Sequence, residues 1–488
     1  MTQRNGLLCK VAVCAFVSAA LTLCFAEAEE NAVQFTGMVN MQSGQLENYK
    51  YGVKGHELTN QWIQNNQMVL GLRAQFNPRL KANIGVFGWL YYNLFPDSML
   101  VDPSRVSKAT AVDFHFDRAE MVLNLSPDPQ DSLCEVHIGI APYKYNHEAR
   151  NLGEYLFRTG CYPGYIVQDG LDLWPQIAGV RVGSNLFNFW HNELFLTSEL
   201  YLYPMNDFSL TYLTDAVLAK GALTIGGGVQ LYRCFSVNND YTQPKYYMSS
   251  VALPGSTPRA PNYYFADNDP QHSDTLYYTF AGTKLMARFT FDPKPLLGGW
   301  DLLGAEDLKL YSEAIILGTK SYPANPDKPS QPWNAVPINE FGYSDLMQKM
   351  PIMVGFNFPT FKVLDVFSLE VEYYGKKYLN RVPVATQGLS MMRLPVPYDN
   401  QLNGGYPNGS PEMNEDGTYS RSTYYGGAAQ WKWSLYLKRS FLGNFNITAL
   451  LARDHSRVQT SLPQSVDQEE ALIKDQQWYW LLKFGFNF

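Results

Sequence analysis

The chain has 488 residues, 15% of them aromatic and 17% charged, and its formal net charge is −7. This acidic balance, without a basic patch in the sequence, argues against nucleic acid as a partner. Beyond the N-terminal segment, no apolar run approaches the roughly 20 residues that a membrane-spanning helix needs. Abundant aromatic residues without such runs are typical of a membrane β-barrel, in which only alternate residues of a strand face lipid.

The N-terminus predicts a signal peptide over residues 1–28. Arg4 and Lys10 form its basic start, residues 11–25 are an apolar run, and residues 26–28 read Ala-Glu-Ala, an A-x-A cleavage site. A membrane anchor is the alternative, but the apolar run is short for a spanning helix. We therefore expect a secreted mature chain.

Cysteine placement leaves two further possibilities open. A lipoprotein attached through Cys24 is a second alternative to the cleaved signal, although Leu23 stands where such signals carry a small residue. Three cysteines remain after cleavage, too few for a disulfide scaffold in an oxidising compartment. Cys161 and Cys234 are both expected on the outer side and are candidates for one bridge, whereas Cys134 is predicted to face lipid.

Alternation of apolar and polar residues predicts 16 strands, with 14 or 18 as alternatives. The last strand is the clearest, because Phe484, Phe486 and Phe488 share an apolar face and Lys483 lies on the other. In the fourth strand the alternation changes parity near Asp117, which indicates a β-bulge or a misplaced strand boundary. The predicted strands cover residues 33–41, 66–76, 80–93, 112–125, 133–141, 177–189, 192–203, 207–217, 219–233, 276–292, 307–319, 351–359, 364–378, 426–440, 443–454 and 476–488.

The connections between these strands alternate in length, and only 204–206 and 293–306 depart from the rule. Long outer loops alternating with short periplasmic turns are the pattern of an outer-membrane barrel, and an even strand number places both termini in the periplasm. A soluble β-sandwich or propeller is the alternative, but no blade-length repeat is present. The predicted fold is therefore all-β, an antiparallel up-and-down transmembrane barrel that forms one domain over residues 29–488. The long connections cover residues 42–65, 94–111, 142–176, 234–275, 320–350, 379–425 and 455–475.

The polar parity of the strands is expected to line the inside of the barrel. Charges at this density need water or one another, because an unpaired charge in a dry interior is costly, and about 16 strands enclose an aqueous channel. Pairing across strands that stiffens the wall and a constriction that filters solutes are both open interpretations. The inward residues are predicted to be Lys81, Arg118, Arg181, Lys284, Arg288, Lys309, Lys432, Lys438 and Lys483, with Glu120, Glu135, Glu193, Glu199, Glu313, Glu370 and Glu372.

The connection 142–176 is the candidate for that constriction, or else for a cap over the outer mouth. Leu152, Tyr155 and Leu156 have helical spacing and Gly160 is a terminator, so a short helix is expected here. A helix with one apolar stripe would pack against the inner wall of the barrel.

In barrel architecture, loop order and C-terminal Phe, the chain resembles the general porins, although it carries no porin sequence signature. In porins the third outer loop folds into the barrel and narrows it. The resemblance implies a constriction lined by Lys144, His147, Glu148, Arg150, Glu154 and Arg158. Among the inward residues of the strands, the pore-lining candidates are Arg118, Glu120, Arg181, Arg288, Glu370 and Glu372.

The resemblance also implies the surroundings of the protein. It places the chain in the cell outer membrane, in contact with a lipopolysaccharide-type outer leaflet, and allows a homotrimer. Phe484, Phe486 and Phe488 resemble the C-terminal signal that barrel-assembly machinery recognises.

A porin-like channel for passive diffusion of small hydrophilic solutes is the expected function. A hydrophobic-substrate transporter of the fatty-acid type is the first alternative, but it needs an N-terminal hatch, and few residues precede the first predicted strand. A structural or adhesive barrel that displays its loops is the second. No ion or organic cofactor is expected.

Motifs for catalysis or metal binding do not stand out. H-E-x-x-H, G-x-S-x-G and phosphate-binding glycine motifs are absent from the sequence, so no enzyme is expected. Asp267, Asp269 and Asp274 lack the spacing of a calcium loop, which favours a solvated loop tip. Residues 226–228, Gly-Gly-Gly, lie inside a predicted strand and indicate relief of crowding or a bend.

Overall fold

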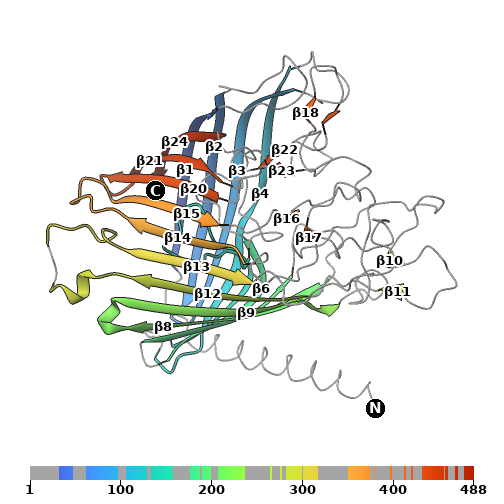
Figure 1. The fold of residues 1–488 in the computed structure, drawn as a ribbon. Coiled ribbons are helices and arrows are strands. Elements are labelled where there is room, and N and C mark those ends of the chain that lie inside the picture. Colours follow the sequence, from blue (N-terminus) through green and yellow to red (C-terminus); the bar gives the residue numbers. More distant parts are fainter. Residues whose placement is uncertain are drawn as a thin grey trace.

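The computed structural model describes the barrel and parts of its long connections (Figure 1). Sixteen strands close into one antiparallel barrel, each paired with its neighbour in chain order. The described residues are 32–47, 62–96, 106–128, 133–157, 176–186, 189–198, 207–236, 264–265, 275–276, 282–298, 301–316, 350–373, 378–379, 396–397, 412–413, 419–420, 431–454, 457–459, 468–470 and 477–488.

The barrel strands are β1 (Ala32–Glu47), β2 (Trp62–Asn77), β3 (Leu80–Pro96), β4 (Val106–Asn124), β5 (Cys134–Pro142), β6 (Gln176–Leu186), β7 (Trp190–Ser198), β8 (Asp207–Leu218), β9 (Leu223–Ser236), β12 (Gly282–Phe291), β13 (Leu310–Ile316), β14 (Ile352–Asn357), β15 (Val366–Tyr373), β20 (Trp431–Phe441), β21 (Phe445–Arg453) and β24 (Trp478–Asn487). Four two-stranded pairs lie outside it: β10 (Tyr264–Phe265) with β11 (Thr275–Leu276), β16 (Tyr378–Leu379) with β17 (Val396–Pro397), β18 (Glu412–Met413) with β19 (Tyr419–Ser420), and β22 (Arg457–Gln459) with β23 (Gln468–Glu470).

The predicted fold class and strand number are confirmed. The first and last strands close the barrel, with β1 antiparallel to β24 from Met38 opposite Asn487 to Glu47 opposite Trp478. Some predicted boundaries are wrong by a few residues. The strand predicted from residue 219 begins at Leu223, because the 3-10 turn η2 (Ala219–Gly221) precedes it, with Lys220 at φ 60°. The strand predicted from residue 276 begins at Gly282.

The bulge predicted near Asp117 is present. Gly85 on β3 lies opposite Arg118, whereas its neighbour Val86 lies opposite Phe116, so Asp117 is the extra residue of β4. An extra residue reverses which face the following side chains occupy. That reversal is why the alternation in the sequence changes parity at this point.

Alternate side chains point out of and into the barrel. On β24, Phe484 and Phe486 are 38% and 46% exposed on the outside, whereas Tyr479, Leu481 and Lys483 are buried inside. Large apolar side chains are likewise exposed on the outer face of most barrel strands. Such a belt suits lipid, and closure leaves no unpaired strand edge within it.

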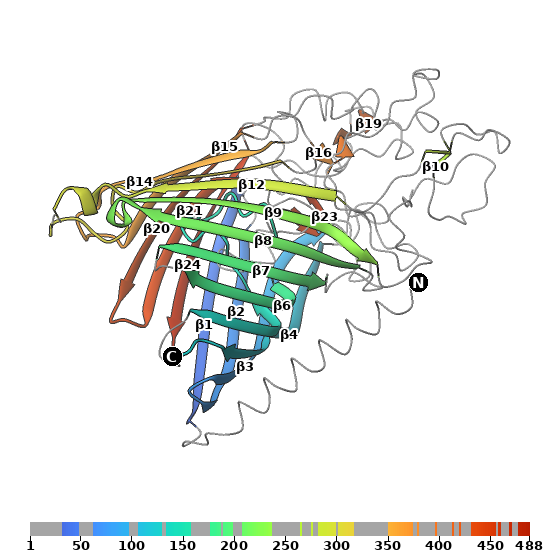
Figure 2. The same ribbon diagram turned by 90° about the horizontal axis from the view of Figure 1, so that it is seen from below.

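The two ends of the barrel differ. Both Ala32, opposite Gln75 of β2, and the C-terminal Phe488 lie at the end that carries the short turns. The strand ends that lead into the long connections lie at the opposite end, on the same side as the short strands β10 and β16 in Figures 1 and 2. We name them the short-turn end and the long-loop end. No helix among the described residues is long and apolar enough to cross a membrane.

Candidate pore and constriction loop

Residues 143–157, which we name the lumen loop, follow β5 and lie inside the barrel. Glu370, an inward and fully buried residue of β15, accepts hydrogen bonds from the backbone N–H groups of Arg150, Asn151 and Leu152, the last two at 2.8 Å. Hydrogen bonds to a carboxylate are stronger than those between neutral groups. One wall carboxylate therefore holds three consecutive loop residues.

A second wall carboxylate holds the next turn of the lumen loop. Glu313 on β13 accepts from the N–H groups of Glu154 and Tyr155, at 2.9 and 3.0 Å, and from the side-chain amide of Asn146 at 3.2 Å. The Tyr155 hydroxyl donates to Glu372 on β15 at 2.5 Å. The loop is thus tied to the wall through its backbone as well as its side chains.

The helix expected in this connection is wrong for the described part, residues 143–157. Gly153 and Glu154 have φ of 84° and 61°, in the left-handed region that ends a right-handed helix. The Glu154 carboxylate instead accepts from the N–H groups of Tyr145 and Asn146, at 3.2 and 2.5 Å. Wall and loop carboxylates satisfy the N–H groups that a helix would bond internally.

Apolar contacts complete the attachment. Leu152 and Tyr155 are fully buried and Leu156 is 2% exposed. Each buried side chain of this kind contributes roughly 1.5–3 kcal/mol. The inner wall is therefore not uniformly polar, and its apolar patch receives the three residues that the sequence singled out. The patch consists of Phe195, Leu213, Met286, Tyr311, Ile315 and Met353.

Glycine lets inward side chains on alternate strands meet. Gly226 of β9 lies opposite both Asp215 of β8 and Arg288 of β12. Arg288 Nε donates to Asp215 Oδ1 at 2.8 Å across the glycine, and its Nη1 donates to the Tyr145 carbonyl of the lumen loop at 2.7 Å. A Cβ on Gly226 would stand 1.9 Å from Asp215 Oδ1. The predicted relief of crowding is confirmed at Gly226.

The same arrangement recurs beside the main loop anchor. Gly355 of β14 lies between Tyr311 of β13 and Glu370 of β15. The Tyr311 hydroxyl donates to Glu370 Oε1 at 2.9 Å, and a Cβ on Gly355 would meet the tyrosine ring at 2.2 Å. The glycine gap therefore positions the carboxylate that binds the loop.

An ionic cluster joins the lumen loop to the turn 301–309 at the short-turn end. Arg150 pairs with Glu306 at 2.6 Å, and Lys309 pairs with Glu306 at 2.9 Å and with Glu148 at 3.1 Å. Burial acts to raise the pKa of Glu306, but the hydrogen bond and charge of Lys309 and the charge of Arg150 outweigh it and hold that pKa below its usual value. Glu306 is therefore ionised at neutral pH.

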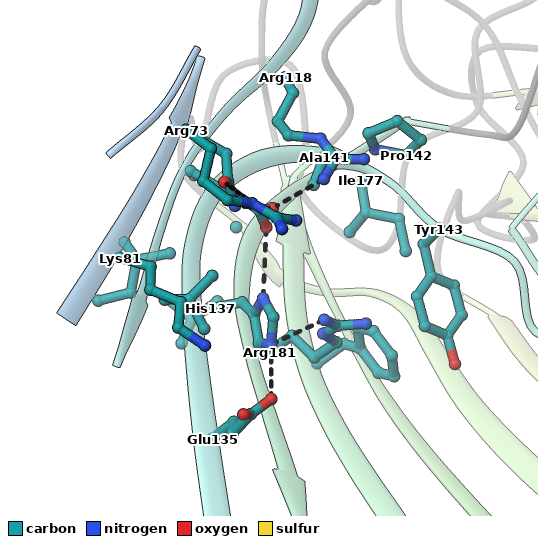
Figure 3. Close-up of a pocket in the computed structure, with 18 of the residues that line it drawn as sticks. Arg73, Lys81, Arg118, Glu135, His137, Ala141, Pro142, Tyr143, Ile177 and Arg181 are labelled. Carbon is teal, nitrogen blue, oxygen red and sulfur yellow. Dashed lines mark hydrogen bonds and ion pairs between the residues drawn. The ribbon is translucent and has the colours of Figure 1, made fainter. Parts of the chain in front are cut away.

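The opposite wall, β2 to β6, carries a cavity of about 480 Å³, which we name the basic cavity (Figure 3). Arg118 lies 3.4 Å from Glu120, and Arg181 Nη2 lies 2.8 Å from His137 Nε2. Polar and charged side chains of this wall face the cavity together with the start of the lumen loop. Its lining includes Arg73, Lys81, Asn83, Arg118, Glu120, Glu135, His137, Pro142, Tyr143, Ile177, Arg181 and Phe195.

The predicted site residues therefore separate into two groups. One group holds the lumen loop: Lys144, Glu148, Arg150, Glu154, Arg288, Glu370 and Glu372. The other lines the basic cavity: Arg118, Glu120 and Arg181. His147 is an exposed residue of the loop. Arg158, Glu199, Cys161 and the three aspartates Asp267, Asp269 and Asp274 lie outside the described residues.

Sequence reasoning missed several residues of both groups. Arg73, His137 and Tyr143 line the basic cavity, and Glu306 holds the loop. Strand parity places Arg73 and His137 inside, so alternation was a usable signal for them. Glu306 lies in a turn 156 positions from Arg150, and no local sequence pattern predicts that contact.

Comparisons with known proteins found only distant structural similarity. No protein-family model matches the chain, and no curated protein sequence matches it. Pseudomonas putida OprB has a TM-score of 0.48 at 11% identity, over 93% of this chain and 94% of its own. The outer membrane channel DcaP of Acinetobacter baumannii has 0.41 at 9%, over 94% and 97%, and Salmonella typhi OmpF has 0.41 at 9%, over 94% and 98%. At these scores the function of this chain is inferred from its own geometry.

Proposed function

We propose that this protein is an outer-membrane channel of the porin type, through which small hydrophilic solutes diffuse passively. One observation carries the proposal. The lumen loop is tied to β13 and β15 by Glu313 and Glu370, while the opposite wall keeps a cavity lined by charged side chains. A loop that occupies one side of a wide barrel narrows the passage without closing it.

We also propose how the barrel is oriented in the outer membrane and what surrounds it. The short-turn end faces the periplasm, so both ends of the barrel chain lie there, after removal of residues 1–28. The lumen loop enters from the long-loop end and forms the constriction. The outer belt contacts lipid and lipopolysaccharide, and a homotrimer is the proposed assembly.

Single-channel recording in planar bilayers tests the channel. Purified protein, shown to be folded by its heat-modifiable migration in gels, should give discrete ohmic steps. A constriction smaller than the barrel predicts that neutral sugars above a size limit permeate liposomes much more slowly than small ones. Folded protein that stays silent in bilayers and passes no sugar contradicts the proposal.

A barrel that displays its loops is the second candidate, and one observation favours it. Lys432 and Lys483 point into the lumen yet are only 3% and 0% exposed, as is Glu372 at 0%. Charges buried in this way stiffen a wall rather than contact solutes. Silence in bilayers from folded protein would select this candidate.

A further inference from the structure

The basic wall of the lumen and the aromatic start of the lumen loop meet in one cavity. We propose that the basic cavity is a binding site for small organic anions in which a carboxylate is joined to an apolar, ring-sized body. The inference names a substrate class for the proposed channel and rests on that function. Figure 3 shows the two sides of the site: Arg73, Arg118 and Lys81 on one, and Pro142, Ile177 and Tyr143 on the other.

The basic side holds cations that the wall does not fully compensate. Arg118 and Arg181 have carboxylate neighbours, Glu120 at 3.4 Å and Glu193 at 3.6 Å. Among the described residues Lys81 and Arg73 form no ion pair, and Arg73 Nε only donates to the Asn83 amide oxygen at 3.2 Å. Two cations thus remain for an external carboxylate.

The balance of charge around the cavity is positive. Four cationic side chains line it, and the carboxylates beside them are Glu120 and Glu135 of the lining and Glu193, the partner of Arg181, which leaves an excess of one positive charge. The loop carboxylates do not offset this excess, because Glu148 pairs with Lys309 and Glu154 accepts from loop N–H groups. The lumen loop therefore narrows the passage without adding negative charge to the basic side.

The apolar side is preformed. The Tyr143 ring makes edge contacts with Phe195 and Phe157, with centroids 4.9 and 5.4 Å apart, and its hydroxyl donates to Glu193. Ile177 packs against the same cluster. A ring fixed on two sides and by its hydroxyl presents a rigid apolar surface at little entropic cost on binding.

Size and chemistry together select the ligand class. A volume of about 480 Å³ lies within the range of small-molecule sites, roughly 300–1,000 Å³. Arginine favours carboxylates through paired N–H donors, and the apolar side favours a ring over a bare anion. Inorganic ions and small acids such as acetate would use only the basic side.

Equilibrium binding to detergent-solubilised full-length protein tests the site without requiring conduction. Ligand-observed NMR would use benzoate, with acetate lacking the ring and benzyl alcohol lacking the charge. The double variant Arg73→Gln/Lys81→Gln should weaken benzoate about tenfold, the effect of losing roughly 1.4 kcal/mol. Tyr143→Ala should weaken benzoate several-fold and leave acetate unchanged. Lys220→Gln, on an exposed turn, is the matched control and should change nothing.

Salt provides a second readout that needs no variant. Raising ionic strength should weaken benzoate binding to the wild-type protein and leave benzyl alcohol unaffected, because only the charged ligand is screened. Benzoate that binds no tighter than benzyl alcohol, or equally well to the double variant, overturns the site. Conduction without benzoate binding would contradict the proposed site and support the proposed channel. Benzoate binding without conduction would support the site and contradict the channel.

Discussion

At the scale of single residues, glycines decide which side chains can meet inside this barrel. Gly226 and Gly355 each occupy the middle of a three-strand row whose outer members bond across them, Asp215 with Arg288 and Tyr311 with Glu370. Neighbouring strands are about 4.8 Å apart, so side chains two strands apart meet only when the residue between them is small.

Gly226→Ala should therefore destabilise the barrel. The new Cβ would stand 1.9 Å from Asp215 Oδ1 and 2.8 Å from Arg288 Cγ, so the ion pair must separate, at a cost of about 1–3 kcal/mol. Urea unfolding of refolded protein measures the loss. The neighbouring Gly227→Ala is the control, since its Cβ would meet only a carbonyl at 3.6 Å and should leave stability nearly unchanged.

Glu370→Gln should loosen the lumen loop. The Glu370 carboxylate accepts from three loop N–H groups. The glutamine side chain has only one acceptor oxygen, and its NH2 group would face loop N–H groups with which it cannot form a hydrogen bond. Each lost charge-assisted bond costs roughly 1.5–3 kcal/mol. Hydrogen exchange of the Asn151 and Leu152 amides should accelerate by tenfold or more. Glu135→Gln, the same change on the other wall, should leave their exchange unchanged; acceleration there too would contradict an anchor specific to Glu370.

At the scale of elements, the lumen loop is a segment whose conformation the wall imposes. Its N–H groups bond to Glu313 and Glu370, and its apolar side chains fill a patch contributed by five different strands. Without the wall, a segment of this length would not hold left-handed residues at Gly153 and Glu154.

The ionic cluster at the tip of the lumen loop gives a pH dependence of known sign. Because the pKa of Glu306 is held below its ordinary value of 4.5, ionised Glu306 contributes stability that is full above that value. The contribution is lost as the pH falls through the lowered pKa. Loop proteolysis or channel noise should therefore rise only in acid, once the pH falls below 4.5. Glu306→Gln should show the acid behaviour at neutral pH. A wild-type protein and variant with the same pH profile would contradict the assignment.

At the scale of the whole molecule, the C-terminal residue completes the closure of the barrel. Phe488 exchanges two backbone hydrogen bonds with Gly37 of β1, at 2.8 and 2.9 Å. Its ring covers that glycine, where a Cβ would stand 2.2 Å from the ring. The residue proposed as the assembly signal therefore also forms part of the seam between the first and last strands.

Deleting Phe488 should reduce the amount of assembled barrel in cells more than it reduces the free energy of unfolding of refolded protein. Phe488→Ala separates the two roles, because it keeps the backbone bonds to Gly37 and removes the ring. The loss of stability should be about 1–2 kcal/mol, measured by urea unfolding. Equal losses of assembly and stability in the deletion would count against a signal role. Phe441→Ala, an exposed outer aromatic on β20, is the control.

The barrel and its two faces could be predicted from sequence, because strand alternation is a local property. Residues two apart share a face, so Phe484, Phe486 and Phe488 identify the outer side and Arg118, Glu120 and Arg181 the inner one. Even the bulge at Asp117 is visible as a change of parity. The lengths of the turns and loops are also local properties, and they predicted the order of the strands.

Only the tertiary structure decided how the interior is used. The contacts of the lumen loop join residues far apart in the chain, with Tyr155 158 positions from Glu313 and Leu152 218 from Glu370. Which inward residues face one another depends on strand register and closure, and neither is encoded in any short stretch. For that reason alternation placed Glu370 inside correctly, while only the closed barrel assigned it to holding the loop and left the basic cavity on the opposite wall.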